Sequence, residues 1–231
     1  MKTLILGDIH CFWSLVNSLI EKLRPDLILQ LGDFGYFPKS DDLYDPCKHL
    51  VLGKSVVRFI DGNHEDHDAL SKFRGENPTA HELCPGLFYQ ERGSFLDLPD
   101  GRRVLFIGGA DSIDKDQRTQ GFDWFPEEII TGEDLARLPH GKVDIVCSHT
   151  SPSRFGVRES YIKRQGGFTD YEKDPSEDAL DYAFERYRPK LWFFAHWHAK
   201  MSGETDGCRW YGLDCAGGHR YSYLWLGDLE D

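Results

Sequence analysis

Short apolar runs alternate with stretches of helical periodicity along this chain. The runs are rich in Leu, Ile, Val and Phe and indicate strands. Strands are predicted over residues 3–6, 27–31, 56–60, 103–107, 143–147, 191–195, 209–213 and 221–226. The last two runs are expected to form terminal strand pairs.

Amphipathic periodicity predicts helices over residues 12–24, 126–138 and 175–187. Pro25 ends the first of these, and Pro126 suits the first turn of the second. The alternation of strands and helices predicts an α/β fold with a mixed sheet or two stacked sheets. No repeat or Pro/Ser-rich linker divides the chain, so residues 1–231 are expected to form a single domain.

Composition and charge narrow the class of protein. Hydrophobic residues make up 40% of the chain and charged residues 29%, which is the balance of a soluble globular protein. The net charge of -12 argues against broad binding to duplex nucleic acid. A phosphorylated substrate stays compatible with it, because bound divalent cations can reverse the local field.

The expected location is the cytoplasm. The apolar stretch near Leu4 is too short for a signal peptide, and no run approaches the roughly 20 residues of a membrane span. The cysteines show no CxxC pair and are expected to be free thiols; they are Cys11, Cys47, Cys84, Cys147, Cys208 and Cys215. A structural zinc site on the last two is disfavoured, since it needs closer spacing and two further ligands.

Five of the predicted strands are followed by Asp, Asn or His. These residues are Asp8 and His10, Asp33, Asn63 and His64, His149, and His196 and His198. Taken singly, each has an ordinary explanation as a turn residue or helix cap. In α/β sheets, however, ligand sites lie outside the carboxyl ends of the strands, so the coincidence of all five favours one shared site.

The residue types suit a pair of metal ions. A carboxylate can bridge two cations, while imidazole and amide oxygen complete each coordination sphere, a donor set compatible with Mn, Fe or Zn. Two ions roughly 3.5–4 Å apart would clamp an in-line displacement and activate a bridging water. From spacing alone, His196 and His198 fit either a mononuclear zinc site or two neighbouring ions.

In this order, the blocks GDIH, GDFG, GNHE, SH and AHWH resemble the five signature blocks of the calcineurin-like metallophosphoesterase superfamily. They run from residue 7 to residue 198, most of the chain. The resemblance implies an α/β (α+β) fold with four αββα layers, in which a β-sandwich is flanked by helices. It also implies a dinuclear metal site at the strand ends.

The resemblance assigns a role to each residue. One metal would be held by Asp8, His10, Asp33 and His198, and the second by Asp33 as the bridge, Asn63, His149 and His196. His64 would be the general acid that protonates the leaving oxygen, a role worth roughly 10²–10⁴ in rate, and with Asn63 would contact the phosphoryl group. The implied cofactors are two divalent transition-metal ions, with Mn²⁺ favoured and Fe, Zn, Ni or Co as alternatives.

Departures from the family pattern bear on the substrate. Cys11 and Ala195 replace glycines of the first and last blocks. The protein Ser/Thr phosphatases carry GDxxDRG, but here Tyr36 and Phe37 stand in place of its second Asp and its Arg. The sequence is more similar to small bacterial and phage members, some of which hydrolyse cyclic nucleotides, including 2′,3′-cyclic ones.

Two further segments carry candidate substrate contacts. The segment 108–128 is similar to one shared by a bacterial and phage subgroup, and would bring Asp114, Arg118 or Trp124 over the metals. Arg118 would pair with a phosphate oxygen and Trp124 would stack on a base; the alternative is a Gly-rich turn with Trp124 packed. In the second segment a solvated loop is favoured over a basic rim of Arg154, Arg158, Lys163 and Arg164 with Phe155 and Tyr161.

Residues beside the expected ligands have supporting roles at most. Asp61, Glu65 and Asp66 flank Asn63 and His64 and are candidates to orient histidines of the site. Trp197 is expected to point away from the site and pack.

The sequence therefore predicts a metal-dependent phosphoesterase that hydrolyses phosphodiesters of nucleotide type, with 2′,3′-cyclic nucleotides favoured. A metal-bridging hydroxide would attack phosphorus, and His64 would protonate the leaving group. The alternative is a phosphomonoesterase on a small molecule or phosphoprotein. A non-catalytic scaffold is disfavoured by the presence of His64, and a single-zinc hydrolase leaves Asp33, Asn63 and His149 unexplained. The expected partner is a phosphorylated small molecule, with no duplex nucleic acid and no membrane.

Overall fold

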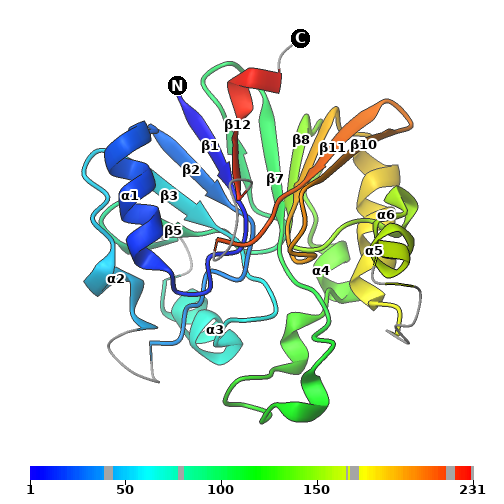
Figure 1. Ribbon diagram of the computed structural model, residues 1–231, viewed down its shortest axis with the longest axis horizontal. Coiled ribbons are helices and arrows are strands. Elements are labelled where there is room, and N and C mark those ends of the chain that lie inside the picture. The colour runs from blue at the N-terminus through cyan, green and yellow to red at the C-terminus, as the bar shows by residue number, and fades with distance from the viewer. Residues whose placement is uncertain (39–43, 78–80, 165, 167–171, 217–221, 230–231) are drawn as a thin grey trace.

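Two mixed sheets of six strands form the centre of the protein (Figure 1). The computed structural model describes residues 1–38, 44–77, 81–164, 166, 172–216 and 222–229. In spatial order the first sheet contains β12 (Tyr223–Trp225), β1 (Thr3–Leu6), β2 (Leu27–Gln30), β3 (Val56–Phe59), β5 (Leu87–Tyr89) and β4 (Glu82–Cys84). The second contains β10 (Met201–Thr205), β11 (Cys208–Gly212), β9 (Leu191–Phe194), β8 (Ile145–Ser148), β7 (Arg103–Ile107) and β6 (Phe95–Asp97).

Both sheets follow the same plan. Their four central strands run parallel, and an antiparallel strand closes each edge. The helices are α1 (Trp13–Leu23), α2 (Pro46–His49), α3 (His67–Glu76), α4 (Gly132–Ala136), α5 (Val157–Arg164) and α6 (Pro175–Tyr187). Because α1 packs on the outer face of the first sheet and α6 on that of the second, the layers run αββα, as predicted.

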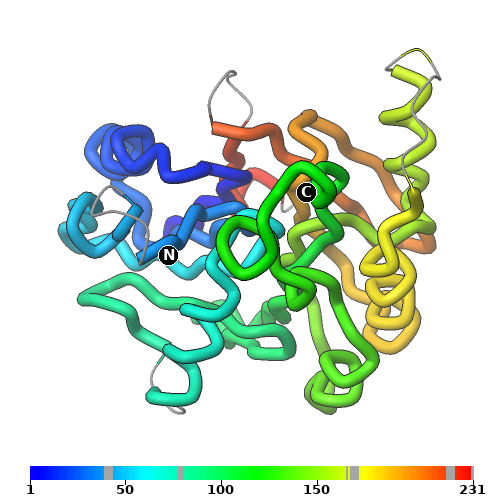
Figure 2. The backbone as a smooth tube through the Cα atoms, turned by 90° about the horizontal axis from the view of Figure 1, so that it is seen from below, coloured from blue at the N-terminus to red at the C-terminus, as the bar shows by residue number. Residues whose placement is uncertain are grey.

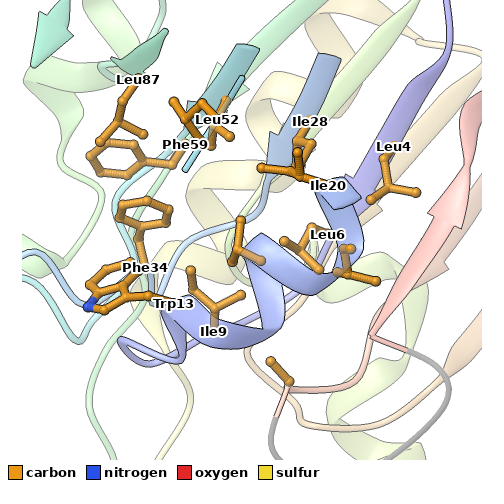
Figure 3. Close-up of a cluster of buried hydrophobic side chains, with 14 of the residues drawn as sticks. Leu4, Leu6, Ile9, Trp13, Ile20, Ile28, Phe34, Leu52, Phe59 and Leu87 are labelled. Atoms are coloured by element: carbon orange, nitrogen blue, oxygen red, sulfur yellow. The ribbon is translucent and has the colours of Figure 1, made fainter. Parts of the chain in front are cut away.

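Alternation along the strands explains the apolar runs. Leu4 and Leu6 of β1 lie in the apolar cluster that also contains Ile20 of α1 (Figure 3). Ile5, between them in the strand, belongs instead to the cluster shared with the second sheet. Since successive side chains point to opposite faces and both faces are buried, most positions of such a strand are apolar. The strands bearing the expected site residues are therefore fixed on both sides.

The predicted helix over 126–138 is wrong. Pro126–Glu128 forms a 3₁₀ turn, and α4 begins separately at Gly132 behind a capping box on Thr131. The side chain of Arg92 donates hydrogen bonds to the carbonyl oxygens of residues 127, 128 and 129, at 2.9, 2.9 and 2.8 Å. Those carbonyls are thus not available to a continuous helix, and the chain bends around the guanidinium group.

The chain end also differs from the expectation. β11 forms a hairpin with β10, whose polar sequence gave no strand signal, while β12 joins the other sheet beside β1. β11 and β12 are therefore not partners. Residue 221, at the start of the last predicted run, lies outside the described residues.

The prediction of free thiols is wrong for one pair. Cys47 in α2 and Cys84 in β4 form a disulfide across 37 residues of sequence, with their Cα atoms 5.9 Å apart. The fold brings these segments together, which spacing along the chain did not indicate. Cys11, Cys147, Cys208 and Cys215 are free. A disulfide is more usual in oxidising compartments than in the cytoplasm, the location expected from the sequence.

Among the described residues, no helix combines the length and the apolar character that crossing a membrane requires.

The packing of α6 on the second sheet predicts how a truncation there changes stability. Phe184 is fully buried against Trp192, whereas Tyr182 of the same helix is 51% exposed. Phe184→Ala is expected to lower the free energy of unfolding by about 3–5 kcal/mol, measured by urea denaturation. The control Tyr182→Ala should change it by less than about 0.5 kcal/mol, as surface substitutions do. Equal losses in the two variants would contradict this packing.

Candidate metal centre

The residues that follow five parallel strands meet at one edge of the two sheets. Asp8, Asp33 and Asn63 follow strands of the first sheet, and His149 and His196 follow strands of the second. Figure 2 views the protein from this side, where the loops of both sheets lie next to each other. The site therefore lies at the seam between the sheets.

Several of these residues have a strained backbone. His10, Asp33, His196 and His198 have φ angles of 43°, 49°, 66° and 44°, in the left-handed region that favours glycine. Such conformations cost of order 1–3 kcal/mol each and cluster at functional sites. The strands end here in sharp turns that aim these side chains at one another.

The first group consists of Asp8, His10, Asp33 and His198. One ligand atom of each lies within 4.8 Å of all the others. His10 Nε2 is 3.2 Å from His198 Nε2, which in turn is 3.2 Å from Asp8 Oδ2. Asp33 Oδ2 lies 3.7 Å from His10 Nε2. Four metal-binding atoms thus surround one point.

The second group lies next to the first and shares Asp33. The Oδ1 atom of Asn63 is 3.0 Å from His149 Nε2 and 3.0 Å from His196 Nδ1. His149 Nε2 lies 3.3 Å from Asp33 Oδ1. The two oxygens of Asp33 therefore face different groups, as a bridging carboxylate requires.

The electrostatics of these groups fit divalent cations. Asp8 and Asp33 are 0% and 2% exposed, and their ion-pair partners among the described residues are histidines alone. Burial would raise the pKa of Asp33, but His149, His64 and His10 hold it well below its usual range. Buried carboxylates without Lys or Arg need another source of positive charge. Carboxylate, imidazole and amide donors together suit transition metals.

Residues beside the ligands hold the loops in place. Glu65, fully buried, accepts hydrogen bonds from the backbone N–H groups of Phe34, Gly35 and Gly62 at 2.6, 3.1 and 2.8 Å. It thereby ties the loop after β2 to the loop after β3; burial raises its pKa to about 8, with a contribution from Asp33. Glu65 therefore supports the backbone of two loops, whereas the sequence had suggested that it orients a histidine ring.

Asp61 and Asp66 also differ from that expectation. Asp61 receives two hydrogen bonds from Arg92, at 2.9 and 2.7 Å, and one from the Tyr89 hydroxyl at 2.9 Å. Asp66 caps α3 by accepting from the Ala69 N–H at 2.8 Å. The contact between Asp61 and Arg92 links the loop after β3 to residues 127–129, because Arg92 also donates hydrogen bonds to their carbonyl oxygens.

A pocket of about 530 Å³ opens over the two groups. His64, Asp33, Asn63, His196 and His198 line one side, and residues 111–116 and 118 line another. The segment 108–128, which extends below the sheets in Figure 1, therefore forms part of the pocket wall.

Arg118 reaches the site, as its sequence position suggested. Its Nη2 atom is 2.6 Å from His64 Nε2 and 2.8 Å from Asp114 Oδ1, and Nη1 donates to the Asn63 carbonyl at 3.3 Å. A guanidinium group only donates, so His64 Nε2 accepts and the ring is neutral in this arrangement. Burial, reinforced by Arg118 and His10, lowers the pKa of His64 although Asp33 and Asp114 oppose it.

Trp124 does not reach the site. It is not among the residues that line the pocket, and its indole N–H donates to Glu128 Oε1 at 3.2 Å. Stacking of Trp124 on a substrate base thus has no support in the structure.

The basic rim does not form as a unit. Phe155 is buried and stacks on Trp210, and Arg154 pairs with Asp181 and Glu185. Lys163 and Arg164 are exposed at the end of α5. Only Arg158 and Tyr161 of this segment line the pocket.

Trp197 combines two roles where one was expected. It packs against the core under α6, but it also lines the pocket beside Tyr161, with ring centroids 5.4 Å apart.

Ser112 was missed. It follows β7, whose carboxyl end meets the same edge as the other five strand ends, and its hydroxyl accepts from Asn63 Nδ2 at 3.1 Å. The signal was the run Gly108–Gly109 directly after a predicted strand, which continues to Asp111 and Ser112.

Comparison with known proteins defines the class. Residues 1–200 match the family model of calcineurin-like phosphoesterases, and the chain belongs to this family. Its class is that of metal-dependent phosphoric ester hydrolases. No curated protein sequence matches the chain.

Among solved structures, phosphopantetheinyl hydrolase from Mycobacterium tuberculosis is 14% identical with a TM-score of 0.52, over 100% of this chain and 96% of that one. An archaeal phosphodiesterase is 10% identical with a TM-score of 0.46, over 98% and 100% of the two chains. A predicted phosphoesterase from Streptococcus pneumoniae is 10% identical with a TM-score of 0.42, over 98% and 83%. The first of these likenesses establishes a shared fold.

The crowding at Gly62 predicts a variant that impairs the centre. A Cβ atom there would overlap Asp33 Oδ1 and lie 2.8 Å from His149 Nε2, whereas one at Gly75 in α3 would meet nothing within 4 Å. Gly62→Ala is expected to weaken metal binding at least about tenfold, the usual scale for disturbing a ligand's support, and so to lower the metal that dialysed protein retains. Gly75→Ala should leave it unchanged. Elemental analysis of both dialysed proteins measures this, and full metal content in Gly62→Ala would contradict the geometry.

Proposed function

We propose that this protein is a metal-dependent phosphodiesterase that acts on small-molecule phosphodiesters of nucleotide type, with 2′,3′-cyclic nucleotides favoured. The observation that carries the proposal is the pair of ligand groups sharing Asp33 on the floor of a pocket that also contains His64 and Arg118. A phosphate ester placed there would meet metal-binding atoms and two polar side chains that are not part of either group.

The metal-binding residues divide as the family pattern suggests. Asp8, His10, Asp33 and His198 would hold the first ion, and Asp33, Asn63, His149 and His196 the second. When bound, two such ions supply positive charge to the phosphoryl oxygens and an activated water as nucleophile. Manganese is the favoured metal. The separation of His196 and His198 into different groups supports their assignment to different ions.

His64 and Arg118 would act on the substrate itself. The hydrogen bond between them leaves Arg118 able to pair with a phosphoryl oxygen, since its guanidinium group offers five N–H donors. A bound phosphate group would compete for Arg118 and free His64 Nε2 to carry the proton needed by the leaving oxygen. General acid catalysis of this kind contributes roughly 10²–10⁴ in rate.

The charge of the pocket wall supports a diester. Outside the two ligand groups, Lys115, Arg118 and Arg158 face a larger number of carboxylates, namely Asp111, Asp114, Asp116, Glu172, Asp174 and Glu177. A diester carries a single negative charge, whereas an ionised monoester carries nearly two. Because acidic side chains outnumber basic ones in this part of the wall, the substrate with less charge is favoured. The volume of about 530 Å³ suits a small molecule.

The positions that distinguish protein phosphatases lie away from the pocket. Tyr36 packs against the core under α1, with its ring 6.5 Å from that of Phe59, and Phe37 contacts Tyr44. Neither is among the residues that line the pocket. The aromatic pair thus supplies no acid and no phosphate-binding cation to the site.

A substrate panel tests the proposed reaction. With Mn²⁺ added, kcat/KM should be highest for 2′,3′-cyclic AMP and bis-p-nitrophenyl phosphate, and at least about tenfold lower for p-nitrophenyl phosphate and a phosphopeptide, a difference of about 1.4 kcal/mol in the barrier. Including 3′,5′-cyclic AMP separates the two cyclic classes. Preference for the monoester and the phosphopeptide would overturn the choice of a diester.

His64→Ala tests the general acid. The variant should keep the wild-type metal content, because the His64 side chain belongs to neither ligand group. Its kcat should fall roughly 10²–10⁴-fold on esters with poorly leaving alkoxides and much less on p-nitrophenyl esters, whose leaving group needs no proton. His140→Ala, at an exposed position, is the matched control. Undiminished turnover of a poor leaving group would exclude this role.

A further inference from the structure

Asn63 contributes to the second ligand group only if its amide is turned the right way. Its Oδ1 atom faces His149 and His196, and its Nδ2 atom faces Ser112. The oxygen and nitrogen ends of an amide are nearly the same size, so hydrogen-bonding neighbours decide the orientation. Rotated by half a turn, Asn63 would present two N–H donors to the place where a cation is expected.

The Ser112 hydroxyl alone cannot fix this orientation. A hydroxyl both donates and accepts, so it would serve an amide oxygen as well as an amide nitrogen. It selects the nitrogen only if its own hydrogen is engaged elsewhere, which leaves its lone pairs directed at Asn63.

Glu128 offers that hydrogen an acceptor. Its Oε1 atom accepts from the Ser112 backbone N–H at 2.6 Å, and its Oε2 atom is buried with no hydrogen-bond partner among the described residues. Both residues are fully buried, so water does not compete for this contact. Trp124 holds the carboxyl group from the other side through its indole N–H, at 3.2 Å.

We infer that Ser112 and Glu128 are positioning residues that keep the Asn63 amide oxygen directed at the second metal ion. The chain of contacts runs from Trp124 through Glu128 and Ser112 to Asn63. It gives the segment 108–128 a role at the centre in addition to its place in the pocket wall. This inference rests on the proposed function, because it presupposes that a second ion binds.

The inference is tested by titrating metal-free protein with Mn²⁺, following binding by calorimetry and the coupling of paired ions by electron paramagnetic resonance. Wild-type protein should bind two ions. Ser112→Ala should keep the dissociation constant of the first ion and raise that of the second by roughly 10–100-fold, the usual cost of removing a ligand's hydrogen-bond partner. The signal of the coupled pair should give way to that of isolated Mn²⁺.

The matched control is Ser94→Ala, which removes a hydroxyl that has no hydrogen-bond partner within the described part of the chain. It should bind both ions as wild-type protein does. The unchanged first dissociation constant of Ser112→Ala serves as a check that this variant is folded.

The same Ser112→Ala change in the Asn63→Asp variant tests whether Ser112 orients the Asn63 amide or only packs against it. A carboxylate has an oxygen at both ends, so Asn63→Asp needs no device to orient it. Adding Ser112→Ala to Asn63→Asp should change the second dissociation constant by no more than about twofold, the scatter of uncoupled sites. An equal loss in both backgrounds, or no loss in Ser112→Ala alone, would overturn the inference. Loss of the second ion in Asn63→Asp alone would also overturn it, because an oxygen facing the group is all that this position is held to supply.

These outcomes are distinct from failure of the proposed function. If wild-type protein binds fewer than two ions, the dinuclear centre itself is refuted. If it binds two ions and the Ser112→Ala variant binds them equally well, only the positioning role is refuted.

Discussion

The buried negative charge of Asp8 and Asp33 is the constraint on which the structure depends. Both carboxylates are buried at the seam between the two sheets, beneath the pocket. Histidines from both sheets surround them, because the parallel strands of the two sheets end at the same edge. The proposed ions would balance this charge, so the arrangement of the sheets and the chemistry of the site have one physical basis.

The segment after β7 connects that seam to the rest of the protein. Arg92, Asp61 and Glu128 are buried groups that bind its backbone or its side chains, and they bend it away from the helix that its sequence suggests. The same segment carries Arg118, which contacts His64, and Ser112, which contacts Asn63. One irregular segment thus supplies a wall of the pocket and part of the support for the ligands.

The sequence predicted those parts that depend on periodicity and on ordered motifs. Strands buried on both faces, the helices α1 and α6, and the five strand ends were all visible, because burial leaves a regular apolar pattern. What it could not predict depends on contacts between distant segments. The Cys47–Cys84 disulfide, the carbonyls held by Arg92 and the Ser112–Glu128 contact each join residues that only the fold brings together.

The directions in which single side chains point could not be predicted from the sequence either. Trp124 and Trp197 look alike in sequence, as aromatic residues beside polar ones, yet the first binds a buried carboxyl group and the second lines the pocket. The expected roles of Glu65 and Asp61 failed for the same reason, since backbone N–H groups and Arg92 turned out to be their partners.

The left-handed backbone at His10, Asp33, His196 and His198 lies in the same place as the buried carboxylates of Asp8 and Asp33. These four positions add conformational strain to the small region that holds the negative charge, and both penalties are local. The proposed ions would offset both penalties, and they would do so through ligands from both sheets. Metal affinity and the cohesion of the two halves of the sandwich would therefore be linked thermodynamically.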